Sequence, residues 1–153
     1  MAKAQVNAVC SIARSLEVLG ERWTFLILRE AFSGVTRFAD FRAALGIAPD
    51  VLSDRLSTLV ESGILTKQPY REQGARSRFS YHLTPAGHEL LVVLGALQQW
   101  GDDHLPNPGG PTIVRRSRRT GRSLRVDFVD DNGRKVRYKD VEFARTAAYP
   151  DTA

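Results

Sequence analysis

Large apolar residues recur at helical spacing through most of the chain and alternate at strand spacing near its C-terminal end. The first helical stretch covers residues 6–19, and its apolar side is made of Val6, Val9, Ala13, Leu16 and Leu19. Residues 21–32 are almost continuously apolar, which is typical of a buried central helix. Gly20 between them suits a helix C-terminus. The pattern therefore predicts two consecutive helices.

A short helix and a longer amphipathic helix are predicted next. We expect Thr36 to cap a helix over residues 37–45. Pro49 suits the first turn of a helix over residues 49–62. The inward stripe of that helix is expected to hold Leu52, Leu56, Leu59 and Val60. Two helices joined by a tight turn form a helix-turn-helix pattern.

The next segment predicts a hairpin and a long helix. Residues 64–70 and 78–84 are expected to be strands on either side of a polar loop. A hairpin directly after a helix-turn-helix is a wing. Thr84 and Pro85 then suit the N-cap and the first position of a helix that ends near Leu105. Its apolar stripe is expected to hold Leu90, Leu91, Leu94, Leu97 and Trp100.

The breaker-rich residues 106–111 divide the chain into predicted domains of residues 1–105 and 106–153. In the tail we expect a strand at residues 112–114 and a longer hairpin around the turn Asp131-Asn132-Gly133. Its strands are expected to run from Leu124 to Phe128 and from Val136 to Phe143. The predicted fold class is mainly α with a small β wing (α+β), a winged helix-turn-helix with a C-terminal β-hairpin extension.

Charge is unevenly distributed between the two parts. The 153 residues carry a formal charge of +5. Residues 1–105 hold 11 basic and 11 acidic residues, whereas residues 106–153 hold 11 basic and 6 acidic residues. No apolar run approaches the roughly 20 residues that cross a bilayer, and no signal-peptide pattern begins the chain. We therefore expect a cytoplasmic protein whose basic excess lies in the tail.

Residues 10–101 resemble the HxlR-type winged-helix transcriptional regulators of bacteria. The matching stretches keep the family's order and spacing: CSIA (10–13), LGERWTFLILRE (19–30), RFADFR (37–42), LSDRL (52–56), GIL (63–65), YHLTPAG (81–87) and WG (100–101). The resemblance implies operator DNA as partner, with either repression or activation as the outcome. It also implies a homodimer joined through the first helix and the helix over residues 85–105.

The resemblance also bears on signals and metals. Some family members respond to electrophiles or oxidants through a cysteine at the position of Cys10, whereas the effector of this chain is unknown. Some relatives carry paired cysteines in a C-terminal hairpin. The tail of this chain has no cysteine, because Cys10 is the only one, so a metal-binding tail is not inferred from them. We expect no metal and no cofactor.

A winged helix places one amphipathic helix in the major groove and its wing beside it. The residues expected at DNA are Thr36, Arg37, Pro49, Asp50, Ser53, Asp54, Arg55, Ser57, Arg76, Ser77 and Arg78. Serine hydroxyls can bond base edges, and arginines can bond phosphates. Arg37 is the favoured phosphate contact, and Arg76 is the favoured contact to a phosphate or to the minor groove, although either can be an ordinary solvated arginine.

Several alternatives stay open. Asp50 and Asp54 either read bases or merely complement the helix dipole. Arg55 either meets a phosphate or pairs with a carboxylate such as Asp40. The acidic reading face also fits a winged helix that binds a protein instead of DNA. The tail arginines Arg115, Arg116, Arg118, Arg119 and Arg122 either contact phosphates or are solvated or paired with acids such as Asp102 and Asp103.

The remaining reactive residues give no sign of catalysis. Cys10 is either a small buried residue or a redox sensor, and Arg14 one turn later could favour its thiolate. No nucleophile–base pair and no phosphate-binding glycine loop occurs, so we expect no enzyme. The aromatic residues expected in the core and at the root of the wing are Trp23, Phe25, Phe38, Phe41, Phe79 and Tyr81.

Overall fold

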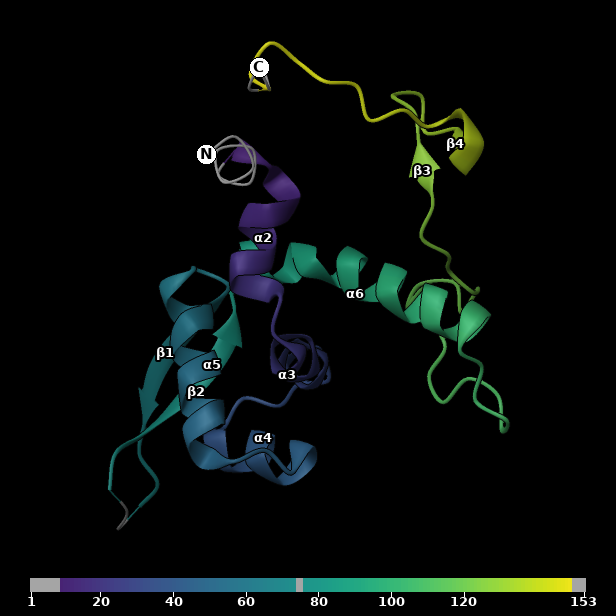
Figure 1. Cartoon of the computed structure of the whole chain (residues 1–153). Coiled ribbons are helices and arrows are strands. Elements are labelled where there is room, and N and C mark those ends of the chain that lie inside the picture. Colours follow the sequence, from purple (N-terminus) through teal and green to yellow (C-terminus); the bar gives the residue numbers. More distant parts are fainter. Residues whose placement is uncertain (1–8, 74–75, 150–153) are drawn as a thin grey trace. The chain divides into compact units, whose positions relative to one another are not determined.

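The computed structural model describes residues 9–73 and 76–149. Its elements, labelled in Figure 1, are α2 (Ser11–Leu19), α3 (Arg22–Phe32), α4 (Phe38–Leu45), α5 (Pro49–Glu61), β1 (Leu65–Tyr70), β2 (Arg78–Leu83), α6 (Pro85–His104), β3 (Phe128–Val129), β4 (Lys135–Val136) and the 3₁₀ turn η1 (Tyr138–Asp140). Two compact units divide the described residues, one ending at Leu91 and one covering Val92–Tyr149. This division falls within α6, and the expected domain boundary after Leu105 stays a prediction. Within the described part, no helix is long and apolar enough to span a membrane.

The core of the first unit is built around α3, which packs against α2, α4, α5 and β2. Ile27 and Leu28 of α3 are completely buried. The core also contains Phe41 of α4, the predicted inward stripe Leu52, Leu56 and Leu59 of α5, and Leu65 of β1. Each such side chain contributes about 1.5–3 kcal/mol through its burial. The predicted central helix and the predicted inner face of residues 49–62 are thus confirmed.

The first predicted helix differs from the structure in its start and in its apolar face. Residues 6–8 lie outside the described residues. Cys10 has an extended backbone, with φ −69° and ψ 120°, and α2 begins after it at Ser11. Only Leu19 of the expected inward stripe is buried, whereas Val9 and Leu16 are exposed together with Ile12, which is 66% exposed. Val9 and Leu16 of the predicted stripe therefore face outward within this unit.

The predicted N-cap at Thr36 is wrong. The Tyr81 N–H donates to the Thr36 carbonyl oxygen at 2.7 Å, and Arg37 forms an antiparallel bridge with Ser80. This short extended segment lies along β2, so α4 starts one residue later with Arg37 as N-cap and no side-chain cap. Gly46 ends α4 in the left-handed conformation, at φ 61°, as its position in the sequence predicts.

The predicted wing is confirmed as an antiparallel hairpin. Its register runs from Leu65 opposite Leu83 to Tyr70 opposite Arg78. The hairpin lies beside α5, which contacts β1 (Figure 1). Phe79 does not join the core as expected. It is 45% exposed, and the Lys67 ammonium lies 4.1 Å from its ring centroid.

The junction between wing and α6 is confirmed as a capped helix start. The Thr84 hydroxyl accepts a hydrogen bond from the Gly87 N–H at 3.0 Å and donates to the Gly63 carbonyl oxygen at 2.6 Å. A Cβ on Gly87 would lie 2.2 Å from the Ile64 carbonyl oxygen, so only glycine allows α6 to approach this closely. The stripe predicted on α6 is only partly inward, because Leu91, Leu97 and Trp100 are exposed.

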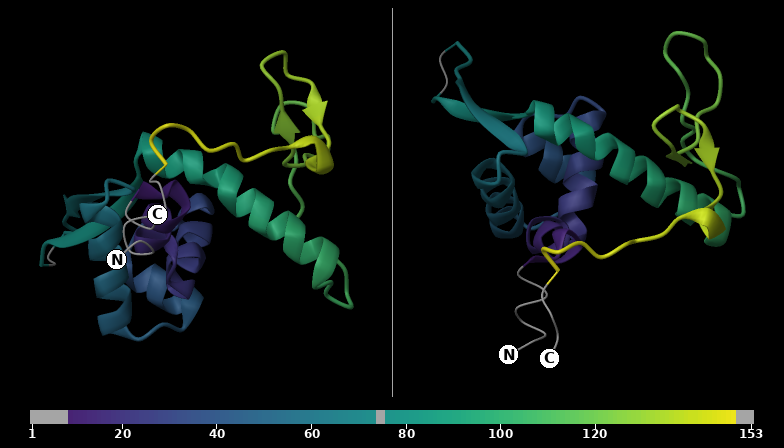
Figure 2. Two further views of the ribbon diagram at one scale, coloured as in Figure 1. Left: turned by 45° about the horizontal axis from the view of Figure 1, so that its top comes forward. Right: turned by 90° about the horizontal axis from the view of Figure 1, so that it is seen from above.

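The second unit contains less β-structure than expected. No strand forms at residues 112–114, because the Ile113 carbonyl oxygen accepts a hydrogen bond from Gln98 of α6. The hairpin is reduced to β3 and β4, since Val126 also bonds α6 and the ion pair Arg137–Asp140 spans the 3₁₀ turn η1. Figure 2 shows this green-to-yellow part of the chain as short loops rather than as a layered sheet.

Candidate nucleic-acid interface

The outer face of α5 is polar and open. Pro49, Asp50, Ser53, Asp54 and Ser57 are all exposed, opposite the fully buried leucines of the same helix. Pro49 occupies the first turn, and Asp50 follows it where the helix dipole favours an acid. The two serines present hydroxyls that can donate or accept hydrogen bonds. This face therefore has the chemistry to bond base edges, with little positive charge of its own.

Arg55 lies at the flank of that face and is half-buried. Within residues 9–73 and 76–149, no carboxylate forms an ion pair with its guanidinium, and the suggested pair with Asp40 does not form. Within the described residues, the Asp54 carboxylate likewise forms no ion pair. Arg55 and Asp54 thus stand at neighbouring positions with opposite charges.

Arg37 joins the start of α4 to the wing. Its guanidinium donates to the Glu72 carboxylate at 2.8 Å and lies 4.8 Å from the centre of the Tyr70 ring. Thr36, the other residue expected at DNA in this segment, is half-buried where its carbonyl oxygen bonds β2. The guanidinium expected at a phosphate is therefore held by an acid of the same chain.

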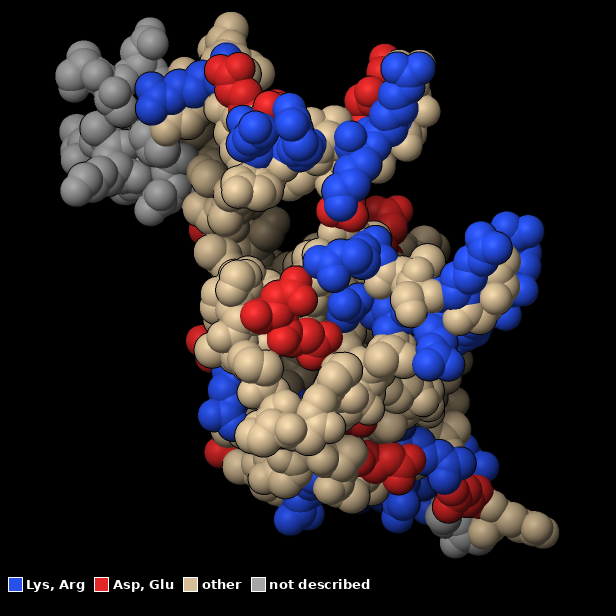
Figure 3. Space-filling model, turned by 90° about the vertical axis from the view of Figure 1, so that its right-hand side faces the viewer, with Lys and Arg blue, Asp and Glu red and all other residues tan. Residues whose placement is uncertain are grey.

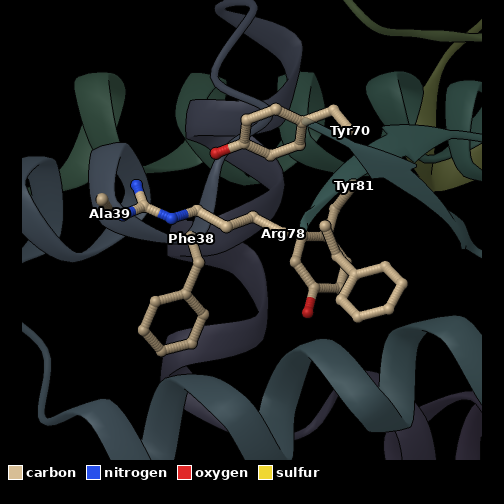
Figure 4. A pocket seen from close by; sticks show the side chains of 6 residues that line it. Phe38, Ala39, Tyr70, Arg78 and Tyr81 are labelled. Carbon is tan, nitrogen blue, oxygen red and sulfur yellow. The ribbon is translucent and has the colours of Figure 1, made fainter. Parts of the chain in front are cut away.

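The far end of the wing carries Arg76 and Ser77, both exposed. Arg78 has a different environment. It lines a shallow, largely apolar groove of about 470 Å³ between α4 and the wing, together with Phe38, Ala39, Tyr70, Phe79 and Tyr81. Figure 4 shows its side chain running between the Phe38 and Tyr70 rings toward Ala39. Burial beside this groove raises the pKa of the Tyr81 phenol above its ordinary value.

Basic and acidic side chains lie next to one another at several places on the face drawn in Figure 3. In the second unit, Arg115 pairs with Asp102 at 3.4 Å and Arg125 pairs with Asp103 at 3.2 Å. Pairing with an acid, one of the alternatives left open for the tail arginines, is thus present for Arg115. Arg116, Arg118, Arg119 and Arg122 are exposed, and no acid pairs with any of them within the described residues.

Cys10 is half-buried at the N-cap of α2. The Arg14 guanidinium one turn later donates to the Ser11 hydroxyl at 3.2 Å. Elsewhere in the described residues, no three His, Cys, Asp or Glu side chains gather as metal ligands. His82 instead bonds the Ser80 hydroxyl at 2.9 Å, and His88 packs its ring against Phe32.

Two residues of this surface were not expected from the sequence. Glu72 and Tyr70 both contact Arg37, although they are more than 30 residues away along the chain. The sequence signal was slight, because Glu72 is the only acid among the wing arginines. Its role depends on the bridge between Arg37 and β2, which sequence periodicity does not predict.

Comparison with proteins of known sequence places the chain in a family. The model of the HxlR-like helix-turn-helix family matches residues 18–108. An uncharacterized HTH-type transcriptional regulator of Mycobacterium bovis is 48% identical over 111 residues, which cover 72% of this chain and 69% of the relative. Another, from Synechocystis, is 35% identical over 102 residues, covering 66% of this chain and 74% of that protein.

Solved structures give the same fold. PA1607, a proposed transcription factor, is similar with a TM-score of 0.79 and 34% identity, covering 91% of this chain and 96% of that one. The reduced form of the transcriptional regulator YodB from Bacillus subtilis has a TM-score of 0.54 and 28% identity, covering 63% and 94%. The first likeness thus includes most of the tail. By its sequence and its winged-helix fold, the chain belongs to the HxlR-like helix-turn-helix family of transcriptional regulators.

Proposed function

We propose that this regulator binds a specific operator sequence in duplex DNA as a homodimer, in the cytoplasm of a bacterial cell. One observation carries the proposal: α5 turns a mostly polar outer face to solvent while Leu52, Leu56 and Leu59 fix its inner face in the core. A rigid helix with free hydroxyl and carboxylate groups can enter the major groove and bond base edges.

In this proposal, Ser53 and Ser57 read bases and the neighbouring cations position the helix. Asp50 and Asp54 would accept hydrogen bonds from cytosine amino groups, because their charge disfavours phosphate contacts. Arg76 at the wing and Arg55 at the flank of α5 would contact phosphates. Arg37 would also contact a phosphate once its hydrogen bond to Glu72 is broken. Phosphate contacts set register and affinity, whereas base contacts set sequence preference.

The homodimer is proposed from exposed apolar side chains on the two helices that the family uses. In the first unit, α2 presents Ile12 and Leu16 to solvent, one turn apart on one helical face. In the second unit, α6 presents Val92, Leu97 and Trp100. Exposed apolar stripes of this kind mark protein contacts. A two-fold dimer would also match a palindromic operator.

The rival function is a winged helix that binds a protein partner through the acidic face of α5. An electrophoretic mobility shift with the promoter DNA flanking the chain's own gene separates the two. We expect a band that specific competitor removes and that an unrelated duplex of equal length does not. No specific band, in the presence or absence of candidate effectors, would favour the rival.

A redox response would act through Cys10, the only thiol of the chain. A reversible disulfide would then need the Cys10 of a second subunit or a small thiol. Cys10 is half-buried, and the Arg14 guanidinium one turn later bonds the Ser11 hydroxyl. We therefore assign Cys10 a packing role and leave the effector of the regulator to a different site.

A further inference from the structure

The residues between Ile113 and Val126, here named the arginine hairpin, are fastened to the C-terminal half of α6. Gln99 makes two hydrogen bonds to Val126, accepting from its N–H and donating to its carbonyl oxygen, both at 3.0 Å. Gln98 donates to the Ile113 carbonyl oxygen at 2.7 Å. A Cβ on Gly95 would lie 3.3 Å from a Val126 methyl carbon, so this glycine allows the close approach. Both ends of the arginine hairpin are thus attached to α6.

Two of its six arginines serve this attachment. Arg115 pairs with Asp102, and both side chains are largely buried, at 21% and 34% exposure. Arg125 pairs with Asp103 at 3.2 Å. The two acids lie in the last turn of α6, where the helix dipole disfavours negative charge. The pairs therefore offset that cost and neutralise both acids of that turn.

The tip of the arginine hairpin, residues 116–123, is closed by its own backbone. Arg116 and Ser123 form an antiparallel bridge, and the Ser117 N–H donates to the Arg122 carbonyl oxygen at 2.9 Å. The Gly121 N–H donates back to the Ser117 carbonyl oxygen at 2.8 Å, with Gly121 at φ 69°. These bonds give the tip one defined shape, in which glycine supplies the left-handed residue.

Four arginines remain on that tip with no acid to neutralise them. Arg116, Arg118, Arg119 and Arg122 are all exposed, and within the described residues none has an ion-pair partner. No Asp or Glu occurs anywhere between Asp103 and Asp127. Four guanidinium groups on eight residues repel one another unless an anion lies among them. Guanidinium groups match phosphate geometry with two parallel N–H···O bonds.

We infer that the tip of the arginine hairpin is a second DNA-contacting site, which binds the phosphodiester backbone of duplex DNA without reading its sequence. The inference rests on the proposed function, because it adds to the grip of the winged helix. The tip has the composition Arg-Ser-Arg-Arg-Thr-Gly-Arg-Ser. It holds no aromatic side chain on which single-stranded bases could stack, and no apolar side chain that could enter a membrane. Rows of phosphates are the remaining polyanion that suits it.

The test is a salt titration of binding to a random-sequence duplex, measured by fluorescence anisotropy with the full chain. In the triple variant Arg118→Gln/Arg119→Gln/Arg122→Gln, each lost phosphate contact lowers the slope of log affinity against log salt by about 0.9. We expect a slope up to about 2.7 smaller per protomer. The corresponding triple lysine variant keeps the charges and is expected to keep nearly the wild-type slope.

A matched control removes three charges elsewhere in the same unit. Arg134, Lys139 and Arg145 are exposed and lie outside the arginine hairpin. The variant Arg134→Gln/Lys139→Gln/Arg145→Gln has the same net charge as the tip variant. We expect its slope to match the wild type. Thermal unfolding by circular dichroism should be alike in all four proteins, because only exposed side chains change.

Each outcome decides the inference. A smaller salt slope in the tip variant, together with a wild-type slope in the control variant, supports the inference. An unchanged slope in the tip variant overturns it, and so does an equal loss in both variants. The same proteins are also tested on phosphatidylserine vesicles and on single-stranded RNA. If the tip variant loses binding to only one of these and binds duplex DNA like the wild type, the inference is also overturned. If the tip variant binds the selected operator as tightly as the wild-type protein does, the inference is wrong but the proposed function still stands. If wild-type protein binds no duplex, the proposed function fails as well.

Discussion

The Arg37 guanidinium donates a hydrogen bond to the Glu72 carboxylate at 2.8 Å and so ties the start of α4 to the wing. Both side chains are about half exposed, at 48% and 50%. Ion pairs of this exposure contribute only about 0–1 kcal/mol. Glu72 therefore holds Arg37 weakly enough for a phosphate to replace it, and we expect Glu72 to lower DNA affinity by the cost of that exchange.

Replacing Glu72 by glutamine should strengthen DNA binding. The Glu72→Gln variant releases Arg37 and removes a negative charge beside the phosphates, so affinity should rise by up to about fivefold. The salt slope should steepen by about one, since Arg37 becomes free to displace a counterion. Anisotropy titrations at several salt concentrations measure both quantities. Glu61→Gln, an exposed acid at the end of α5, is the matched control, and an equal gain in that variant would contradict the role of Glu72.

Replacing Arg76 by alanine should weaken binding to every sequence to the same extent. Arg76 is exposed at the wing and is proposed to contact a phosphate, which carries no sequence information. The Arg76→Ala variant should lose about one unit of salt slope on specific and on random duplexes alike. Arg134→Ala in the second unit serves as the control. An unchanged affinity and slope in Arg76→Ala would remove Arg76 from the interface.

Placing a charge on the outward stripe of α2 should disrupt the dimer without unfolding the chain. Ile12 is 66% exposed within its unit, so the Ile12→Glu variant buries no charge in the monomer. At a dimer contact the same carboxylate would lose its hydration. Sedimentation velocity should find a dimer for wild type and for Ser15→Glu on the same helix, and a monomer for Ile12→Glu. A dimeric Ile12→Glu protein would show that α2 is not the interface.

Removing the Thr84 hydroxyl should destabilise the junction between wing and α6. Thr84→Ala loses the bond from the Gly87 N–H and leaves the Gly63 carbonyl oxygen without its closest donor. Loss of an N-cap costs about 0.5–2 kcal/mol of unfolding free energy. Urea unfolding measures it, with the exposed Thr112→Ala expected within about 0.5 kcal/mol of wild type. A Thr84→Ala protein as stable as wild type would disprove the cap.

Oxidation should leave operator affinity unchanged in this family member. Cys10 is half-buried, and the nearby Arg14 is engaged with Ser11. Treatment with diamide should therefore leave operator affinity unchanged in the wild-type protein and in Cys10→Ser alike. A loss of affinity in wild type that Cys10→Ser does not share would instead make Cys10 the sensor.

The sequence predicted the elements whose signals are local. The apolar stripe of α5, the alternating residues of β2 and the Thr84-Pro85 start of α6 each depend on neighbours within a few positions. The structure confirms all three. These elements also carry most of the residues expected at DNA, so the candidate interface could be placed on α5 and the wing from sequence alone.

The failures come from contacts between distant segments. Thr36 bonds β2 instead of capping α4, and Ile113 bonds Gln98 instead of forming a strand. Phe79 alternates with core residues but faces solvent beneath Lys67. The arginines of the tail look equivalent in sequence, yet Arg115 and Arg125 pair with α6 while the tip arginines do not. Such differences depend on the tertiary fold, which periodicity does not encode.

Selection of bound sequences from a random duplex library tests the central proposal most directly, because it assumes no particular operator sequence. With wild-type protein we expect one enriched motif with two-fold symmetry and half-sites about one helical turn apart, or about 10 base pairs. A parallel selection with Ser53→Ala should enrich a motif altered at defined positions. Recovery of no motif by the wild-type protein, at any salt concentration that permits binding, would contradict sequence-specific recognition by α5.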